Sequence, residues 1–85
     1  MVVNTNYMQS KANIIKIGNK LPRGSFSIIS EETGKTQKTV GDFFKGKTDA
    51  RVETYNLIME VALRILEESI EKNKKMDKRI KALIN

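Results

Sequence analysis

The chain has 85 residues, 39% of them hydrophobic, and its 16 basic and 10 acidic residues give a net charge of +6. This length predicts one domain with a small core. The sequence has no cysteine and no histidine, which excludes disulfides, thiol catalysis and the usual zinc and general-base ligands. We see no signal peptide and no apolar run of about 20 residues, and therefore expect a cytoplasmic protein without a membrane span.

Charge is distributed unevenly along the chain. Residues 1–47 carry eight basic and three acidic side chains, residues 48–71 carry two and six, and residues 72–85 carry six and one. Lysine-rich surfaces are common on soluble proteins, but basic segments also favour a polyanionic partner. We favour the polyanion because the first basic segment also contains a distinctive pair of predicted helices.

The N-terminal region is predicted to be an arm followed by a helix. Residues 1–6 hold no basic residue and are expected to form a flexible arm. A helix is predicted over residues 7–20, with an alternative start at Ser10 and a possible early end at Gly18. Its apolar stripe includes Ile14, Ile17 and Leu21.

The next helix follows a connection that contains Pro22 and Gly24, two residues typical of turns. Ser25 is predicted to cap this helix, and Gly34 is predicted to end it in the left-handed conformation. The apolar side of the helix is formed by Phe26, Ile28 and Ile29.

A second short helix is predicted over residues 37–45, between an N-cap at Thr36 and a terminator at Gly46. Its apolar face consists of Val40, Phe43 and Phe44, at helical spacing. This spacing assigns the phenylalanines to the core rather than to base stacking on single-stranded nucleic acid.

Two short helices around a glycine turn, the second with polar residues at its start, are typical of the helix-turn-helix. The stretch resembles the helix-turn-helix of the lactose-repressor family and of related phage-repressor-like (XRE-like) transcriptional regulators. About a quarter of the chain matches that pattern without a gap. The matching residues are Ser25, Ile29, Thr33, Gly34, Thr36, Thr39, Val40, Phe43, Phe44 and Gly46.

The resemblance implies a bacterial or phage-encoded, nucleoid-associated repressor that binds double-stranded DNA as a homodimer. The predicted DNA-binding surface comprises Ser25, Thr36, Gln37, Lys38, Thr39, Asp42, Lys45 and Lys47. Gln37 and Lys38 are expected at base edges, because glutamine pairs with adenine and lysine donates to guanine. Thr39 would contact thymine or a phosphate, and the other hydroxyls and lysines are expected at phosphates. Any single lysine could equally be an ordinary solvated side chain.

Two departures from the family pattern leave an alternative open. Lys35 replaces an apolar residue of the turn. Asp42 stands where the family often has a basic residue, and phosphate repels a carboxylate facing the duplex. The alternative is a protein-interaction or oligomerisation module on the same fold, with weak or no DNA binding.

The following helix is expected to be capped by Thr48 and Asp49. It carries a broad apolar stripe of Val52, Tyr55, Ile58, Met59, Ala62, Ile65, Leu66 and Ser69. Val61 and Leu63 are apolar but lie off this stripe, which indicates a second packing surface. We expect residues 49–85 to contain a homodimer contact.

Residues 69–85 form a basic tail in which Met76, Ile80, Leu83 and Ile84 continue the helical spacing. The sequence allows one continuous helix or a break near Asn73. The tail could be a solvated face, a phosphate-binding strip or half of a coiled coil, although Ser69 and Asn73 weaken the last reading.

The predicted fold is therefore all-α: a small helix-turn-helix bundle of four to five helices over residues 7–68, with a long C-terminal helix. Nothing supplies a nucleophile–base pair, so an enzyme is not expected. We expect no cofactor, metal, membrane or small-molecule substrate.

Overall fold

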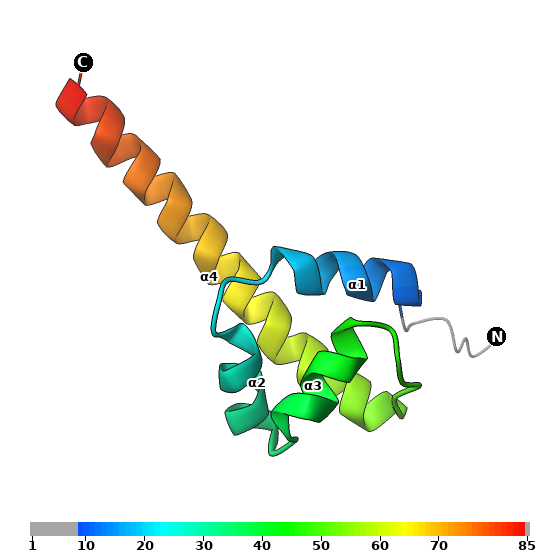
Figure 1. Cartoon of the computed structure of the whole chain (residues 1–85). Helices are drawn as coiled ribbons and strands as arrows, with labels where there is room; N and C mark the ends of the chain where they lie inside the picture. The colour runs from blue at the N-terminus through cyan, green and yellow to red at the C-terminus, as the bar shows by residue number, and fades with distance from the viewer. Residues whose placement is uncertain (1–8, 85) are drawn as a thin grey trace, which may run out of the picture.

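The computed structural model describes residues 9–84, which form four α-helices and contain no strand. The helices are α1 (Lys11–Lys20), α2 (Ser25–Thr33), α3 (Gln37–Phe44) and α4 (Val52–Ile84) (Figure 1). The predicted all-α fold with a long C-terminal helix is confirmed. The predicted arm, and the first two residues of the predicted first helix, lie outside the described residues.

Helix α1 begins later than the predicted start at residue 7. Ser10 has an extended backbone, and its hydroxyl accepts a hydrogen bond from the Asn13 N–H at 3.2 Å. The alternative start at Ser10 is therefore the correct one. Gly18 does not end the helix, which continues to Lys20.

Helix α2 shows one wrong and one confirmed prediction. Its N-cap is Gly24, in the left-handed region at φ 88°, so the prediction that Ser25 caps the helix is wrong. Its end is as predicted, because Gly34 has φ 77° and donates its N–H to the Ser30 carbonyl at 3.0 Å.

Helix α3 ends one residue before its predicted end. Gly46, at φ 73°, donates to the Phe43 carbonyl at 3.2 Å, and the Lys47 N–H donates to the Asp42 carbonyl at 2.9 Å. These two bonds form a Schellman motif, which satisfies the last carbonyls of the helix.

Helix α4 begins at Val52, so the predicted cap at Thr48 and Asp49 is wrong. Asp49 instead forms an ion pair of 2.8 Å with Lys11 in α1. The helix then continues unbroken for 33 residues, which excludes the alternative of a break near Asn73.

The core is formed by one face of each helix. Its buried residues are Ile14, Ile29, Val40, Phe43, Phe44, Tyr55, Ile58, Met59, Val61 and Ala62. Phe44 lies at the centre of an aromatic cluster, 5.5 Å from Phe26 and 5.0 Å from Phe43 between ring centroids. The assignment of the phenylalanines to the core is confirmed. Ile28, expected on the apolar side of α2, is 44% exposed, whereas Val61, expected off the stripe of α4, is buried.

Helices α1 and α3 cross closely at Gly18. A Cβ atom at this position would lie 2.7 Å from the Cβ of Phe44, well inside van der Waals contact. The missing side chain of Gly18 therefore lets α1 lie directly over the aromatic cluster.

The first three helices gather around the first half of α4, and the second half projects away from them (Figure 1). Within residues 9–84, no helix has the length and apolar character to span a membrane.

Candidate nucleic-acid interface

The turn between α2 and α3 is held by side chains of α2. The Ser30 hydroxyl donates to the Lys35 carbonyl at 2.5 Å, and the Thr33 hydroxyl donates to the Ile29 carbonyl at 2.6 Å. Thr33 also accepts from the Lys35 N–H at 3.3 Å. These bonds fix the direction in which the chain leaves α2, and therefore the orientation of α3.

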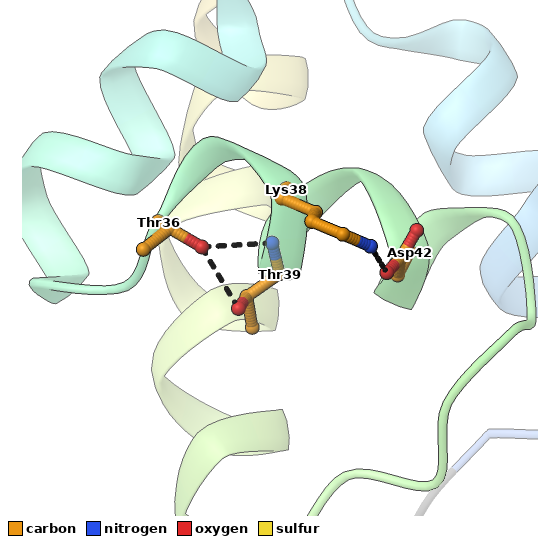
Figure 2. Close-up of polar contacts among 4 residues, drawn as sticks. All are labelled: Thr36, Lys38, Thr39 and Asp42. Carbon is orange, nitrogen blue, oxygen red and sulfur yellow. Dashed lines mark hydrogen bonds and ion pairs between the residues drawn. The ribbon is translucent and has the colours of Figure 1, made fainter.

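Thr36 caps α3 as predicted. Its hydroxyl oxygen accepts a hydrogen bond from the Thr39 N–H at 3.0 Å and donates its proton to the Thr39 hydroxyl at 2.9 Å (Figure 2). The cap satisfies one of the free N–H groups at the start of the helix. The Thr39 hydroxyl keeps its own proton free to donate outward.

Helix α3 has one buried and one exposed side. Val40, Phe43 and Phe44 are buried, and the exposed side begins with three consecutive residues, Gln37, Lys38 and Thr39. Thr36, Lys45 and Lys47 are also exposed, and Asp42 is partly exposed. Seven of the eight predicted site residues therefore lie on the surface, at or next to α3.

Ser25 does not belong to this surface. The residue is 3% exposed, and its hydroxyl donates to the Pro22 carbonyl at 2.6 Å. Since the side chain is buried and its proton is used, the predicted contact between the Ser25 hydroxyl and a phosphate is wrong. Its role is to close the connection before α2.

Lys38 and Asp42 form an ion pair one helical turn apart on α3. The Lys38 ammonium lies 2.9 Å from a carboxylate oxygen of Asp42 (Figure 2). The hydrogen bond from Lys38 holds the pKa of Asp42 below its ordinary value, and the charges of Lys47 and Lys45 add to this effect. Asp42 is thus ionised at neutral pH, and three lysines offset its charge.

Arg23 is a candidate contact that the sequence interpretation missed. It lines a shallow hollow on the surface together with Gln37 and the first residues of α2. A guanidinium at this edge could bind a phosphate beside the bases that Gln37 would reach. No local pattern distinguished Arg23, because its position next to Gln37 arises only when α2 and α3 pack together.

Comparisons with known proteins identify no relative. No family model, no curated protein and no solved structure matches the chain. Any function must therefore be argued from the surface of α3 and its surroundings.

Proposed function

We propose that the chain is a sequence-specific double-stranded DNA-binding protein, a repressor-like transcriptional regulator that inserts α3 into the major groove as a homodimer. One observation carries the proposal. The first turn of α3 exposes Gln37, Lys38 and Thr39 together, while the opposite side of the same helix is anchored in the core. Such a protein would act in the cytoplasm, on the nucleoid of a bacterium or on phage DNA.

The chemistry of the exposed residues fits both kinds of DNA contact. Gln37 can form two hydrogen bonds with adenine, and Lys38 can donate to guanine. Thr36, Lys45 and Lys47 would contact phosphates on either side and set the position of the helix without reading sequence. Arg23 extends this phosphate-binding edge toward α2.

The ion pair with Asp42 does not prevent Lys38 from binding DNA. The Lys38 side chain is 84% exposed, and an exposed ion pair one helical turn apart adds little to stability. Lys38 can exchange this partner for a guanine at small cost. Asp42 would then disfavour placements of α3 on the duplex in which a DNA phosphate lies close to its carboxylate.

The same ion pair favours a second function, a protein-interaction module without DNA binding. With Lys38 neutralised by Asp42, the middle of the exposed side of α3 carries little net charge. A nearly neutral, polar helix face suits a protein partner better than a phosphate backbone.

The first experiment measures binding to a random pool of duplexes at several salt concentrations, followed by sequencing of the retained DNA. We expect enriched sequences and an affinity that falls steeply with salt, because bound lysines displace counterions. Lys45→Ala and Lys47→Ala should each lower the salt slope by about 1. The matched control, Lys16→Ala in the exposed part of α1, should leave the slope unchanged. Binding that does not respond to salt would contradict the proposal.

The second experiment separates the two functions. If the chain binds DNA, Gln37→Ala reduces the preference among sequences, and Asp42→Asn strengthens binding modestly. If a duplex is bound only after Asp42→Arg, the protein-interaction module is the correct reading.

A further inference from the structure

Helix α4 carries a line of seven residues, five of them apolar, which we name the α4 seam. Leu63, Ile70, Asp77 and Ile84 recur every seven residues, and Leu66, Asn73 and Ile80 fall between them. This is the spacing of a helix that pairs with another helix. Leu63, Ile70, Ile80 and Ile84 are 42%, 54%, 47% and 74% exposed, so nothing within residues 9–84 covers them.

The first part of the α4 seam opens into a groove between α1 and α4. Ile17 of α1 lines one side, and Tyr55, Met59 and Leu63 of α4 line the other. The groove has a volume of about 680 Å³ and is mainly apolar, and among residues 9–84 the one charged residue that lines it is Glu60. It therefore suits an apolar helix with basic residues on its flank.

The second half of α4 is a helix of that kind. It projects beyond the other three helices (Figure 1), and every described residue from 70 to 84 is exposed. Ile80 and Ile84 continue the α4 seam, and Lys74 and Lys81 flank it on the side that carries Glu60 and Glu67 in the first half.

We propose that two copies of the chain pair through the α4 seam in antiparallel orientation, each placing the end of its α4 in the α1–α4 groove of the other. In this alignment Ile70 lies opposite the partner's Asn73, and Leu63 lies opposite the partner's Ile80. The exposed apolar residues of both halves become buried in one two-fold symmetric contact.

Charge determines the orientation. The antiparallel alignment brings Glu67 beside the partner's Lys74 and Glu60 beside the partner's Lys81, and symmetry doubles both pairs. A parallel alignment would instead place the basic residues 72–84 of two chains side by side, where like charges repel. Asn73 and Asp77, near the centre of the paired seam, face the partner's Ile70 and the partner's Leu66 in this alignment and therefore lower its stability.

Charge also selects the groove. A second groove, between α2 and α4, is lined by three cations, Arg23, Arg64 and Lys72, and by two carboxylates, Glu32 and Glu68. Glu32 is already paired with Arg64, and the lining has a net charge of +1, which does not attract a basic helix end. Glu60 in the α1–α4 groove does attract it.

This inference supplies the homodimer of the proposed function, but its test contains no DNA, so the two can fail separately. Since the chain has no cysteine, single cysteines can be introduced without background. Leu63→Cys and Ile80→Cys lie at exposed positions and should leave the fold intact. Positions 63 and 80 are 17 residues apart, or about 25 Å along one helix, which excludes a disulfide within one chain.

We expect a mixture of the Leu63→Cys and Ile80→Cys chains to form a disulfide-linked dimer on mild oxidation, while each variant alone forms none. Linked dimers of either variant alone would show parallel pairing and overturn the proposal. If the groove instead takes residues 1–8 of its own chain, or another protein, the chain stays monomeric at all concentrations. That outcome overturns the proposal as well.

A charge exchange gives an independent test in chains that carry no introduced cysteine. Glu67→Lys alone, or Lys74→Glu alone, should raise the dissociation constant of the dimer about tenfold, because two attractive contacts per dimer become repulsive. The double variant Glu67→Lys/Lys74→Glu should restore dimerisation in sedimentation. Loss of dimerisation in the double variant would contradict the antiparallel register.

Discussion

The two halves of α4 have similar apolar spacing and very different surroundings. In the first half, Tyr55, Ile58, Met59, Val61 and Ala62 are buried, and this half packs against α1 and α2 and, through Tyr55, against Phe43 of α3. In the second half, Met76, Ile80, Leu83 and Ile84 are between 47% and 84% exposed. The repeat of apolar residues therefore predicts a helix in both halves, but it does not say whether that helix meets anything within the same chain.

The comparison also explains why α4 does not break at Asn73. Starting a helix is unfavourable, whereas extending an existing one adds a hydrogen bond for each residue fixed. The first half is held by the core and provides the start. Asparagine costs only about 0.7 kcal/mol or less relative to alanine, which cannot stop a helix that is already formed. No glycine or proline follows Val52.

The largest predicted effect contrasts isoleucines from the two halves. Ile58 is 0% exposed, and Ile58→Ala should destabilise the chain by about 2–5 kcal/mol, because it leaves a cavity in the core. Ile80→Ala should change stability by less than about 0.5 kcal/mol at concentrations where the chain is monomeric. Urea denaturation measures both. If both variants lost the same free energy of unfolding in the monomer, α4 would not be divided into a first half anchored in the core and a second half free of it.

The next largest predicted effect is a loss of stability at the close crossing of α1 and α3, beside the first half of α4. Gly18→Ala places a methyl group 2.7 Å from the Cβ of Phe44, and a backbone shift is needed to relieve the clash. We expect a loss of about 1–2 kcal/mol in thermal or urea unfolding, even though alanine favours the helix.

Gly41 provides the matched control for Gly18. It also lies within a helix, but a Cβ atom there would meet Phe26 at 3.9 Å, an ordinary contact. Gly41→Ala should therefore stabilise the chain by about 0.5–1 kcal/mol. A stabilising Gly18→Ala would show that α1 is packed loosely.

Local chemistry predicted most of the fold. The glycines at 34 and 46 and the threonine at 36 act through bonds to residues within five positions, and all three predictions are confirmed. The predictions that failed have two kinds of cause. The Asp49 carboxylate pairs with Lys11 of the distant α1 rather than capping α4. The cap at Ser25 fails locally, because Gly24 takes the cap position and the Ser25 hydroxyl donates to the Pro22 carbonyl.

The candidate site divides in the same way. Helical periodicity alone predicted that Gln37, Lys38 and Thr39 would be exposed, and the four-residue spacing of Lys38 and Asp42 could have predicted their ion pair. Arg23 could not have been found, because its neighbour Gln37 lies beyond α2, at the start of α3.

The smallest predicted effect is a pH dependence of the stability of the fold, which comes from an ion pair between the first half of α4 and α2. Arg64 of α4 donates a hydrogen bond of 2.6 Å to Glu32 of α2. This bond holds the pKa of Glu32 below its ordinary value of 4.5 and raises the pKa of Arg64. Because the pKa of Glu32 is lower in the folded chain than in the unfolded chain, the pair stabilises the fold at neutral pH. That contribution is lost as the pH falls below 4.5 through the folded pKa.

Unfolding curves of the wild type and of Glu32→Gln, measured from neutral pH downward, test this prediction. The wild type should be slightly more stable at neutral pH, and the two curves should converge in acid. Asp77 provides the control from the free half, where it lies 3.8 Å from Lys81. In the monomer, Asp77→Asn should leave the unfolding of the core unchanged, because this part of α4 contacts none of the other helices. A pH-dependent loss in Asp77→Asn equal to that of Glu32→Gln would mean that the second half of α4 is coupled to the core, and the contrast between the halves would fail.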